Sequence, residues 1–268
     1  MVMDNRPIGV FDSGLGGLTV VRQLFDALPQ ERIVYLGDTA RVPYGPRSPD
    51  IVRKFARQDA YFLAGRNVKY VVVACNTASA QAEPDLVRRL AIPVMGVIEP
   101  GAVAALAASS GGRIGVIGTR GTIASGAYQR AILTRRPDAQ VVAHACPLFV
   151  PLAEEGAQAT EAARLIAQDY LRPFLGSVDT LILGCTHYPI LETVIIDAVG
   201  PQMRLIDPGV ALAQHLAGDL TRRGLLAAGD QPAQHQYFVT DRSEHFQELA
   251  ERFLGRRLCA TVEQVDLD

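Results

Sequence analysis

Two cysteines, each at the end of an apolar run, are the strongest candidates for chemistry in this sequence. Cys75 follows residues 70–73 (Tyr-Val-Val-Val), and Cys185 follows residues 181–183 (Leu-Ile-Leu). Such continuous apolar runs predict buried parallel strands. In open α/β sheets, ligands bind at the carboxyl ends of the strands. Two cysteines presented in this way could take a proton from one face of a carbon atom and return one to the other face.

Acid/base partners for Cys185 stand nearby in the sequence. His187 lies two residues after Cys185, and a histidine beside a thiol makes the thiolate available below its reference pKa of about 8.5. A Cys-x-His pair without further ligands at suitable spacing is a poor signature of a zinc site. Glu154 and Glu155 precede a glycine, and one of them could point into a cleft. Glu155 is expected to be a solvated charge.

The other cysteines and the lysines exclude several classes of protein. Four cysteines lie far apart in the chain and form no C-x-x-C pair: Cys75, Cys146, Cys185 and Cys259. Neither a disulfide framework nor a structural zinc site is therefore favoured, and Cys146 and Cys259 are assigned to packing. A pyridoxal enzyme needs a lysine for its Schiff base, but neither Lys54 nor Lys69 is well placed. We expect no metal and no organic cofactor.

Two polar loops follow the first two expected strands. Residues 12–17 (Asp-Ser-Gly-Leu-Gly-Gly) open the first helix, where glycines and free amides suit an anionic group. They match neither a dinucleotide fingerprint nor a P-loop. Asp12 or Ser13 could instead only cap the helix. In residues 37–45, Tyr44 and the Gly45 amide could each donate to a carboxylate, and the competing interpretation is an ordinary turn capped by an aspartate.

Strands and helices are expected to alternate throughout the chain, which predicts an α/β fold with mostly parallel sheets covered on both faces. The expected strands are residues 8–11, 33–36, 70–74, 94–97, 114–117, 141–143, 180–183, 204–206, 236–239 and one near 259–262. The expected helices are residues 18–28, 50–64, 79–90, 121–134, 160–175 and 210–226.

An internal repeat predicts two pseudo-symmetric α/β domains with the active site in the cleft between them. Residues 8–14 resemble residues 114–120, and the two cysteine segments follow at similar separations. The first domain is expected to comprise residues 1–98 and 209–268, and the second residues 99–208. The joints at residues 99–101 (Glu-Pro-Gly) and 207–209 (Asp-Pro-Gly) are expected to be sharp crossing turns.

Composition limits the partners. The chain has 268 residues, of which 49% are hydrophobic, but no apolar run is long enough to span a bilayer. The first residues lack the order of a secretory signal. The net charge is −2, from 26 basic and 28 acidic residues, so no global field attracts nucleic acid. We therefore expect a cytoplasmic protein without membrane or nucleic-acid partners.

Four segments together closely resemble the glutamate racemase family, in the cofactor-independent aspartate/glutamate racemase superfamily. They are residues 12–17, 37–45 (Gly-Asp-Thr-Ala, then Pro-Tyr-Gly), 74–79 (Ala-Cys-Asn-Thr-Ala-Ser) and 184–189 (Gly-Cys-Thr-His-Tyr-Pro). The resemblance runs from about residue 7 to residue 209, with a less distinctive tail. The stretch at residues 124–128 gives no functional clue.

The resemblance implies interconversion of L- and D-glutamate, which supplies D-glutamate for peptidoglycan. It implies that Cys75 deprotonates the D substrate with help from Asp12. It implies that Cys185 deprotonates the L substrate with help from His187 and Glu154. The residues implied to hold the carboxylates and the ammonium are Asp12, Ser13, Tyr44, Gly45, Asn76, Thr77, Thr186 and His187. The family alone also suggests a homodimer.

Three other functions are weighed against this one. A sibling enzyme of the same superfamily would act on aspartate, hydantoins or malonates. A binding or regulatory protein could keep the cleft without chemistry, although the presence of both cysteines argues against it. A thiol-redox or metal protein is disfavoured by the spacing of the cysteines.

Overall fold

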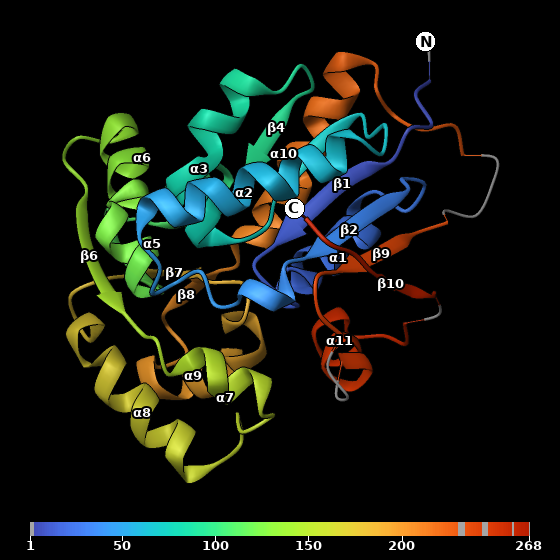
Figure 1. The fold of residues 1–268 in the computed structure, drawn as a ribbon. Helices are drawn as coiled ribbons and strands as arrows, with labels where there is room; N and C mark the ends of the chain where they lie inside the picture. Colours follow the sequence, from blue (N-terminus) through green and yellow to red (C-terminus); the bar gives the residue numbers. More distant parts are fainter. Residues whose placement is uncertain (1–2, 230–233, 243–245, 259, 268) are drawn as a thin grey trace.

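Two parallel β-sheets form the framework of the chain (Figure 1). The computed structural model describes residues 3–229, 234–242, 246–258 and 260–267. Within these ranges, one sheet has six strands in the order β10-β9-β2-β1-β3-β4 and the other has four in the order β6-β5-β7-β8. All of these neighbouring strands run parallel. The predicted α/β fold with mostly parallel sheets is confirmed.

The ten expected strands all have counterparts in the described part of the chain. In the larger sheet they are β1 (Ile8–Asp12), β2 (Ile33–Gly37), β3 (Tyr70–Val73), β4 (Val94–Gly96), β9 (Gln236–Val239) and β10 (Val262–Gln264). In the smaller sheet they are β5 (Arg113–Gly118), β6 (Gln140–Ala145), β7 (Thr180–Gly184) and β8 (Arg204–Ile206). The last strand was expected near residues 259–262, and Cys259 lies outside the described residues.

Helices and short 3-10 turns connect the strands. The helices of the described ranges are α1 (Leu18–Ala27), α2 (Pro49–Ala64), α3 (Asn76–Arg89), α4 (Ile98–Ala108), α5 (Arg120–Ser125), α6 (Ala127–Arg135), α7 (Phe149–Glu154), α8 (Glu161–Leu171), α9 (Glu192–Val199), α10 (Pro208–Arg223) and α11 (Phe246–Leu254). The 3-10 turns are η1 (Thr39–Arg41), η2 (Arg172–Phe174) and η3 (Tyr188–Leu191). No described helix is both long and apolar enough to cross a lipid bilayer.

The larger sheet is buried on both faces, as its apolar strands require. Alternate side chains of a strand point to opposite faces. In β3, Tyr70 and Val72 therefore join one hydrophobic cluster, whereas Val71 and Val73 join another. Every residue of β1, β2, β3 and β7 is buried.

The strand order repeats between the two sheets. The order β2-β1-β3-β4 in the larger sheet corresponds to β6-β5-β7-β8 in the smaller one, and β9 and β10 extend the larger sheet. The two cysteine strands, β3 and β7, therefore occupy equivalent places beside β1 and β5. This repeat confirms the pseudo-symmetry that the sequence predicted.

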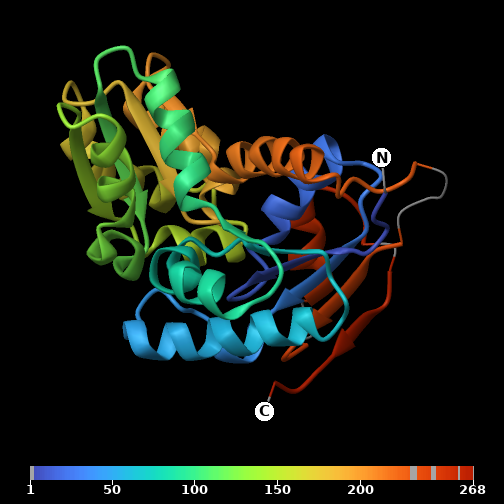
Figure 2. The same ribbon diagram turned by 90° about the horizontal axis from the view of Figure 1, so that it is seen from above.

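The chain passes between the sheets twice, through α4 and through α10, which pack against each other. In Figure 2 the smaller sheet and the larger sheet lie in separate halves of the ribbon, with α10 running between them. The division into domains of residues 1–98 plus 209–268 and residues 99–208 stays a prediction.

Both joints were expected to be sharp turns, and both are helix starts instead. Pro100 lies in the first turn of α4, and Pro208 is the first residue of α10, capped by Asp207. Proline is tolerated at a helix start because the amide it lacks would have no partner there. Gly101 serves close packing, since a β-carbon on it would lie 3.0 Å from Cβ of Pro208.

The expected helices differ from the structure in number and length. The helix expected at residues 121–134 is divided into α5 and α6 at Gly126, whose φ is +63°. The helix expected at residues 160–175 ends at Leu171, and η2 follows with Pro173 inside it. The sequence patterns did not predict α4, α7, α9 or α11.

Candidate active site

Cys75 and Cys185 stand at the carboxyl ends of equivalent strands. Cys75 follows β3 and caps α3, with the amide N–H of Ala78 donating to its Sγ at 3.4 Å. Cys185 follows β7 and precedes η3. Their exposed fractions are 5% and 6%, so both thiols are enclosed in this structure.

The loop after β1 runs between the two cysteine segments. Asp12 is buried, and its Oδ2 accepts a hydrogen bond from the amide of Gly14 at 3.1 Å. Among the described residues, Oδ1 of Asp12 has no hydrogen-bond partner. Directly after the loop, at the start of α1, the Thr19 hydroxyl donates to the backbone oxygen of Thr186 at 3.0 Å. The loop and the start of α1 therefore join the first sheet to the segment that carries Cys185.

Cys75 lies in an environment that holds its proton. The Cys75 Sγ is 3.6 Å from the hydroxyl oxygen of Ser13. Burial raises the pKa of Cys75 to about 12, and the charges of Asp12 and Cys185 act in the same direction. The loop after β1 lies against both cysteine segments, because Ser13 lies beside Cys75 and Gly16 lies beside Thr186 and His187.

His187 links Cys185 to Glu154. The Nδ1 of His187 is 3.8 Å from the Cys185 Sγ, and its Nε2 is 2.9 Å from Oε1 of Glu154. Burial lowers the pKa of His187, but the hydrogen bonds and charges of Cys185 and Glu154 outweigh it and raise the pKa to about 10. A thiolate at Cys185 and a carboxylate at Glu154 therefore both favour an imidazolium at His187.

Asn76 and Thr77 contact side chains that follow β5 of the smaller sheet. The Tyr128 hydroxyl donates to Oδ1 of Asn76 at 2.6 Å. The Thr77 hydroxyl lies 2.8 Å from that of Thr119 and 3.2 Å from that of Thr122. These contacts bring α3 against the segment after β5, on the side of the sheets where the cysteines lie.

Three residues of this cluster were missed by the sequence analysis: Thr119, Thr122 and Tyr128. The internal repeat carried a signal for Thr119, because it aligns Thr119 with Ser13. Tyr128 belongs to the stretch that gave no functional clue. Its partner is 52 residues away in the chain, so no local pattern could have indicated the contact.

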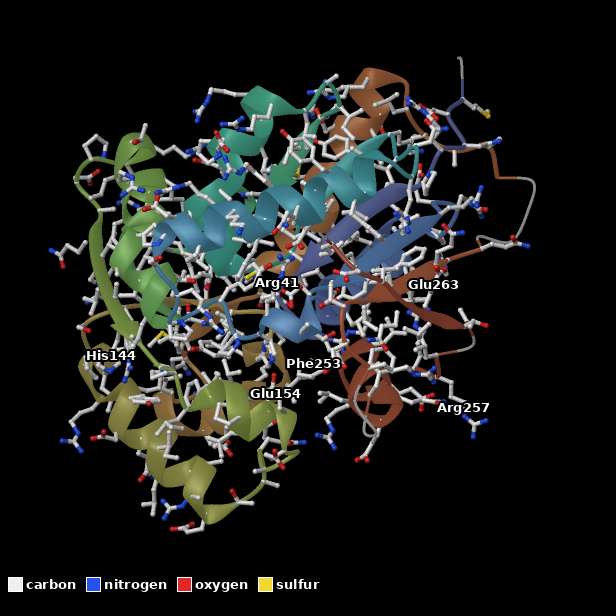
Figure 3. The ribbon with its side chains drawn as sticks, in the orientation of Figure 1. Arg41, His144, Glu154, Phe253, Arg257 and Glu263 are labelled. Atoms are coloured by element: carbon white, nitrogen blue, oxygen red, sulfur yellow. The ribbon has the colours of Figure 1, made fainter. Side chains whose placement is uncertain are left out.

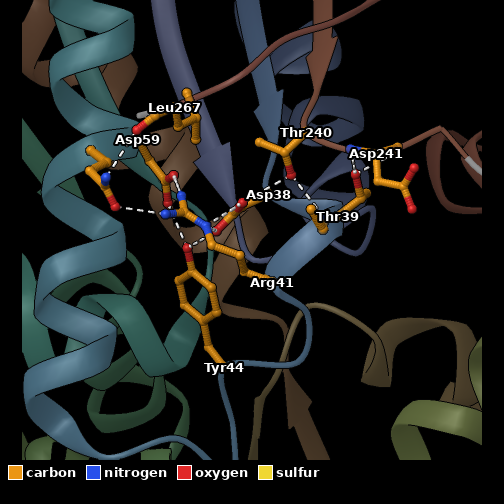
Figure 4. A network of polar contacts seen from close by, with 10 residues as sticks. Asp38, Thr39, Arg41, Tyr44, Asp59, Thr240, Asp241 and Leu267 are labelled. Atoms are coloured by element: carbon orange, nitrogen blue, oxygen red, sulfur yellow. Dashed lines mark hydrogen bonds and ion pairs between the residues drawn. The ribbon is translucent and has the colours of Figure 1, made fainter.

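Tyr44 does not offer its hydroxyl to the cysteines. That hydroxyl contacts the carboxylates of Asp38 and Asp59, with 2.8 Å to Oδ2 of Asp59 (Figure 4). Burial and the charge of Asp38 raise the pKa of Asp59 well above its usual range, and Arg41 pairs with both carboxyl groups. The Tyr44 hydroxyl is thus engaged by two carboxylates of the protein itself. A role of Tyr44 in substrate binding stays a prediction that would involve its backbone.

Gly45 lies at the junction with the second sheet. Its backbone oxygen accepts a hydrogen bond from the amide of Gly121 at 2.9 Å. A β-carbon on Gly45 would stand 2.9 Å from Cβ of Thr119. Because Gly45 has no side chain, its backbone can lie this close to Thr119.

The two lysines lie outside the cluster of residues around Cys75 and Cys185. Lys69 is buried in an ion pair with Glu31 at 2.6 Å, at the end of β3 opposite Cys75. Lys54 is exposed on α2. In the part of the chain that the structure describes, no three His, Cys, Asp or Glu side chains form a group suited to a metal ion. Cys146 is buried in the core, and Glu155 is exposed.

The chain is similar to known racemases in its sequence. A family model described as Asp/Glu/Hydantoin racemase matches residues 8–216. The glutamate racemase of Geobacter metallireducens is 50% identical over 264 residues, which cover 98% of this chain and 97% of that protein.

Two solved structures of glutamate racemases are also similar. That of isoform RacE1 from Bacillus anthracis has a TM-score of 0.93 at 41% identity and covers 98% of each chain. That of the Francisella tularensis enzyme, in complex with D-glutamate, has a TM-score of 0.93 at 40% identity and covers 99% of each chain. The chain therefore belongs to the glutamate racemase family of Asp/Glu/hydantoin racemases.

Proposed function

We propose that this protein interconverts L- and D-glutamate by proton transfer at the α-carbon, with Cys75 and Cys185 as the two acid/base groups. The observation that carries the proposal is the matching placement of the two buried thiols after β3 and β7, beside a shared loop. Family membership supports the reaction class, and the relative from Francisella tularensis was solved with D-glutamate.

The proposed reaction needs one thiolate and one thiol. The Cys185 thiolate takes the α-proton of L-glutamate, and the Cys75 thiol gives its proton to the opposite face of the same carbon. D-Glutamate leaves a Cys75 thiolate and a Cys185 thiol, and the reverse reaction restores the first state. The proposal requires no redox step and no further reactant.

His187 and Glu154 support the Cys185 side in this scheme. A protonated imidazole 3.8 Å from the Cys185 Sγ stabilises the thiolate. Glu154 in turn stabilises the imidazolium through the contact at 2.9 Å. On the Cys75 side, the raised pKa of this thiol suits a proton donor, and the unpaired Oδ1 of Asp12 can accept a proton or bind the substrate ammonium.

Small polar groups would hold the substrate. We assign the carboxylates and the ammonium of glutamate to Ser13, Asn76, Thr77, Thr186, His187 and the backbone of Tyr44 and Gly45, and we add Thr119 and Thr122. The α-hydrogen of an amino acid is far less acidic than a thiol, so a carbanion-like state needs fixed donors and the exclusion of water. The buried thiols and the hydroxyl cluster around Thr77 are consistent with this requirement.

The biological role is proposed from the family. D-Glutamate produced in the cytoplasm would supply peptidoglycan synthesis, and the enzyme would act as a homodimer. Restored growth of a D-glutamate-requiring bacterium that expresses the chain would support the role, and failure with active enzyme present would contradict it. Light scattering tests the homodimer, since a mass of one chain at working concentration would contradict it.

The reaction is tested by incubating the pure protein with L-glutamate in deuterated water without added pyridoxal. D-Glutamate that carries deuterium at the α-carbon is expected. No D-glutamate, or D-glutamate that retains the original α-hydrogen, would contradict the proposal. Racemisation of aspartate in place of glutamate would assign the chain to the sibling activity instead.

A further inference from the structure

We propose that Arg252 and Phe253 of α11 are positioning residues for Cys185, because they fix Glu154 and His187. The inference rests on the proposed function, in which the His187–Glu154 pair supports the Cys185 thiolate. Helix α11 lies in the tail that the sequence analysis found less distinctive. Figure 3 shows the side chains of Phe253 and Glu154 next to each other, where α11 meets α7.

Phe253 covers the imidazole of His187. The two rings meet edge to face, with centroids 4.9 Å apart and an angle of 72° between their planes. Phe253 has no exposed surface, and His187 is 5% exposed. The phenyl ring therefore fixes the tilt of the imidazole and keeps water away from it. Exclusion of water strengthens the interaction of the imidazole with Glu154 and with Cys185.

Arg252 holds the end of α7, which carries Glu154. One guanidinium nitrogen, Nη1, donates to the backbone oxygen of Glu154 at 2.6 Å and lies 3.5 Å from that of Ala153. The last backbone oxygens of a helix have no partner within it, and a cation there also opposes the negative end of the helix dipole. Nη2 donates to Glu248 at 2.9 Å, which fixes the guanidinium.

The backbone at Gly156 leaves room for the Arg252 guanidinium beside the end of α7. Gly156 has φ +67°, and a β-carbon on it would lie 3.0 Å from the central carbon of the Arg252 guanidinium. Glycine is thus required there both for the left-handed backbone and for the approach of the guanidinium. Arg252 therefore occupies a site that the α7 terminus leaves open for it.

Helix α11 connects distant parts of the molecule through these contacts. In the sequence, α11 lies between β9 and β10 of the larger sheet, whereas Glu154 and His187 flank β7 of the smaller sheet in the chain. The helix also packs against α1. The Cys185 side of the site is therefore ordered by an element that belongs to the other sheet. Displacement of α11 from α7 would loosen both members of the pair.

The test compares Arg252→Ala and Phe253→Leu with the wild type, using isotope effects for the two directions. Both variants are expected to lower kcat/KM by about tenfold, because small displacements of a catalytic group are costly. The decrease is equal for both enantiomers, since the equilibrium constant of racemisation is one. The substrate isotope effect is expected to rise with α-deuterated L-glutamate and to fall with α-deuterated D-glutamate, because only proton transfer at Cys185 is slowed.

Matched controls separate positioning from folding. Arg256→Ala removes another arginine of the same region, which pairs with Asp26 of α1 at 3.1 Å. Phe246→Leu removes another buried ring of α11. Both are expected to keep the wild-type isotope effects, and Arg252→Lys is expected to recover part of the lost rate. Unchanged isotope effects in Arg252→Ala and Phe253→Leu would overturn the inference, because a merely structural role lowers the rate without this asymmetry.

A substrate-free measurement keeps the inference distinct from the proposed function. In a nuclear magnetic resonance titration, the His187 imidazole of Phe253→Leu is expected to titrate at a pH lower by about one than in the wild type. An unchanged titration would contradict the positioning of His187 by α11. Absence of racemisation in the wild type would instead contradict the proposed function.

Discussion

Gly16 lies so close to His187 that a β-carbon built on Gly16 would stand 2.5 Å from the imidazole Nδ1. The same β-carbon would also clash with the Thr186 hydroxyl oxygen. The backbone of the loop after β1 therefore touches the Cys185 segment directly. The two halves of the candidate site are set against each other at this contact.

Gly16→Ala is therefore expected to lower kcat/KM by about a hundredfold, since His187 must move to admit the methyl group. Steady-state racemisation kinetics measure the effect. Gly218→Ala is the control, because a β-carbon there would meet only Nη1 of Arg222, at 3.4 Å, within α10. This control should keep full activity and gain up to about 1 kcal/mol of stability. Full activity of Gly16→Ala would contradict the contact.

Glu154→Gln is expected to lower the pKa of His187 and to make stability less dependent on pH. The pKa of His187 is raised to about 10 from a usual value of about 6.5. The stabilisation from this raised pKa is complete below about pH 6.5 and is lost as the pH rises through about 10. The free energy of unfolding of the wild type should therefore exceed that of Glu154→Gln by the largest amount near pH 6. Urea unfolding across this range measures the difference, and a gap that widens with pH would contradict the assignment.

Tyr128→Phe is expected to raise KM severalfold and to lower stability. The change leaves Oδ1 of the buried Asn76 without its donor at 2.6 Å, and an unsatisfied buried acceptor costs about 1–3 kcal/mol. Substrate kinetics and urea unfolding measure the two effects. Tyr61→Phe, on the exposed face of α2, should change neither quantity. An unaltered KM in Tyr128→Phe would show that the orientation of Asn76 does not matter for binding.

Lys69→Met is expected to lower the free energy of unfolding by about 3–5 kcal/mol, because it leaves the buried Glu31 carboxylate without its partner at 2.6 Å. Activity per folded molecule should stay at the wild-type value, since Lys69 and Cys75 lie at opposite ends of β3. Arg88→Ala breaks an exposed ion pair with Asp85 and should lower stability far less, because solvent screens that pair. If Lys69→Met and Arg88→Ala lowered the free energy of unfolding equally, burial would not be what makes the Lys69–Glu31 pair important for stability.

The strands and the cysteine positions could be predicted because they depend on local patterns. A run such as residues 70–73 can be satisfied only where both faces are covered. A cysteine directly after such a run must stand at the ligand-binding edge of the sheet. The repeat then showed that Cys75 and Cys185 occupy equivalent places.

The contacts of Phe253 and Tyr44 and the packing at Gly101 could not be predicted, because each joins residues that are distant in the chain. Nothing near Phe253 in the sequence indicates that its ring meets His187, and the Tyr44 pattern does not reveal that Asp59 lies beside its hydroxyl. The joint at Gly101 was misread because glycine permits a turn and also permits close helix packing. The contact of Gly101 with Pro208, which lies far away in the sequence, shows that this glycine serves close helix packing and not a turn.

A panel of cysteine variants tests whether two thiols act on one carbon atom. Cys75→Ala, Cys185→Ala and Cys146→Ala would each be incubated with L-glutamate, and D-glutamate would be measured over time. Racemisation is expected to be abolished in the first two variants and retained in Cys146→Ala, whose thiol is buried in the core. Racemisation by Cys185→Ala, or its loss only in Cys146→Ala, would show that Cys75 and Cys185 are not the two acid/base groups.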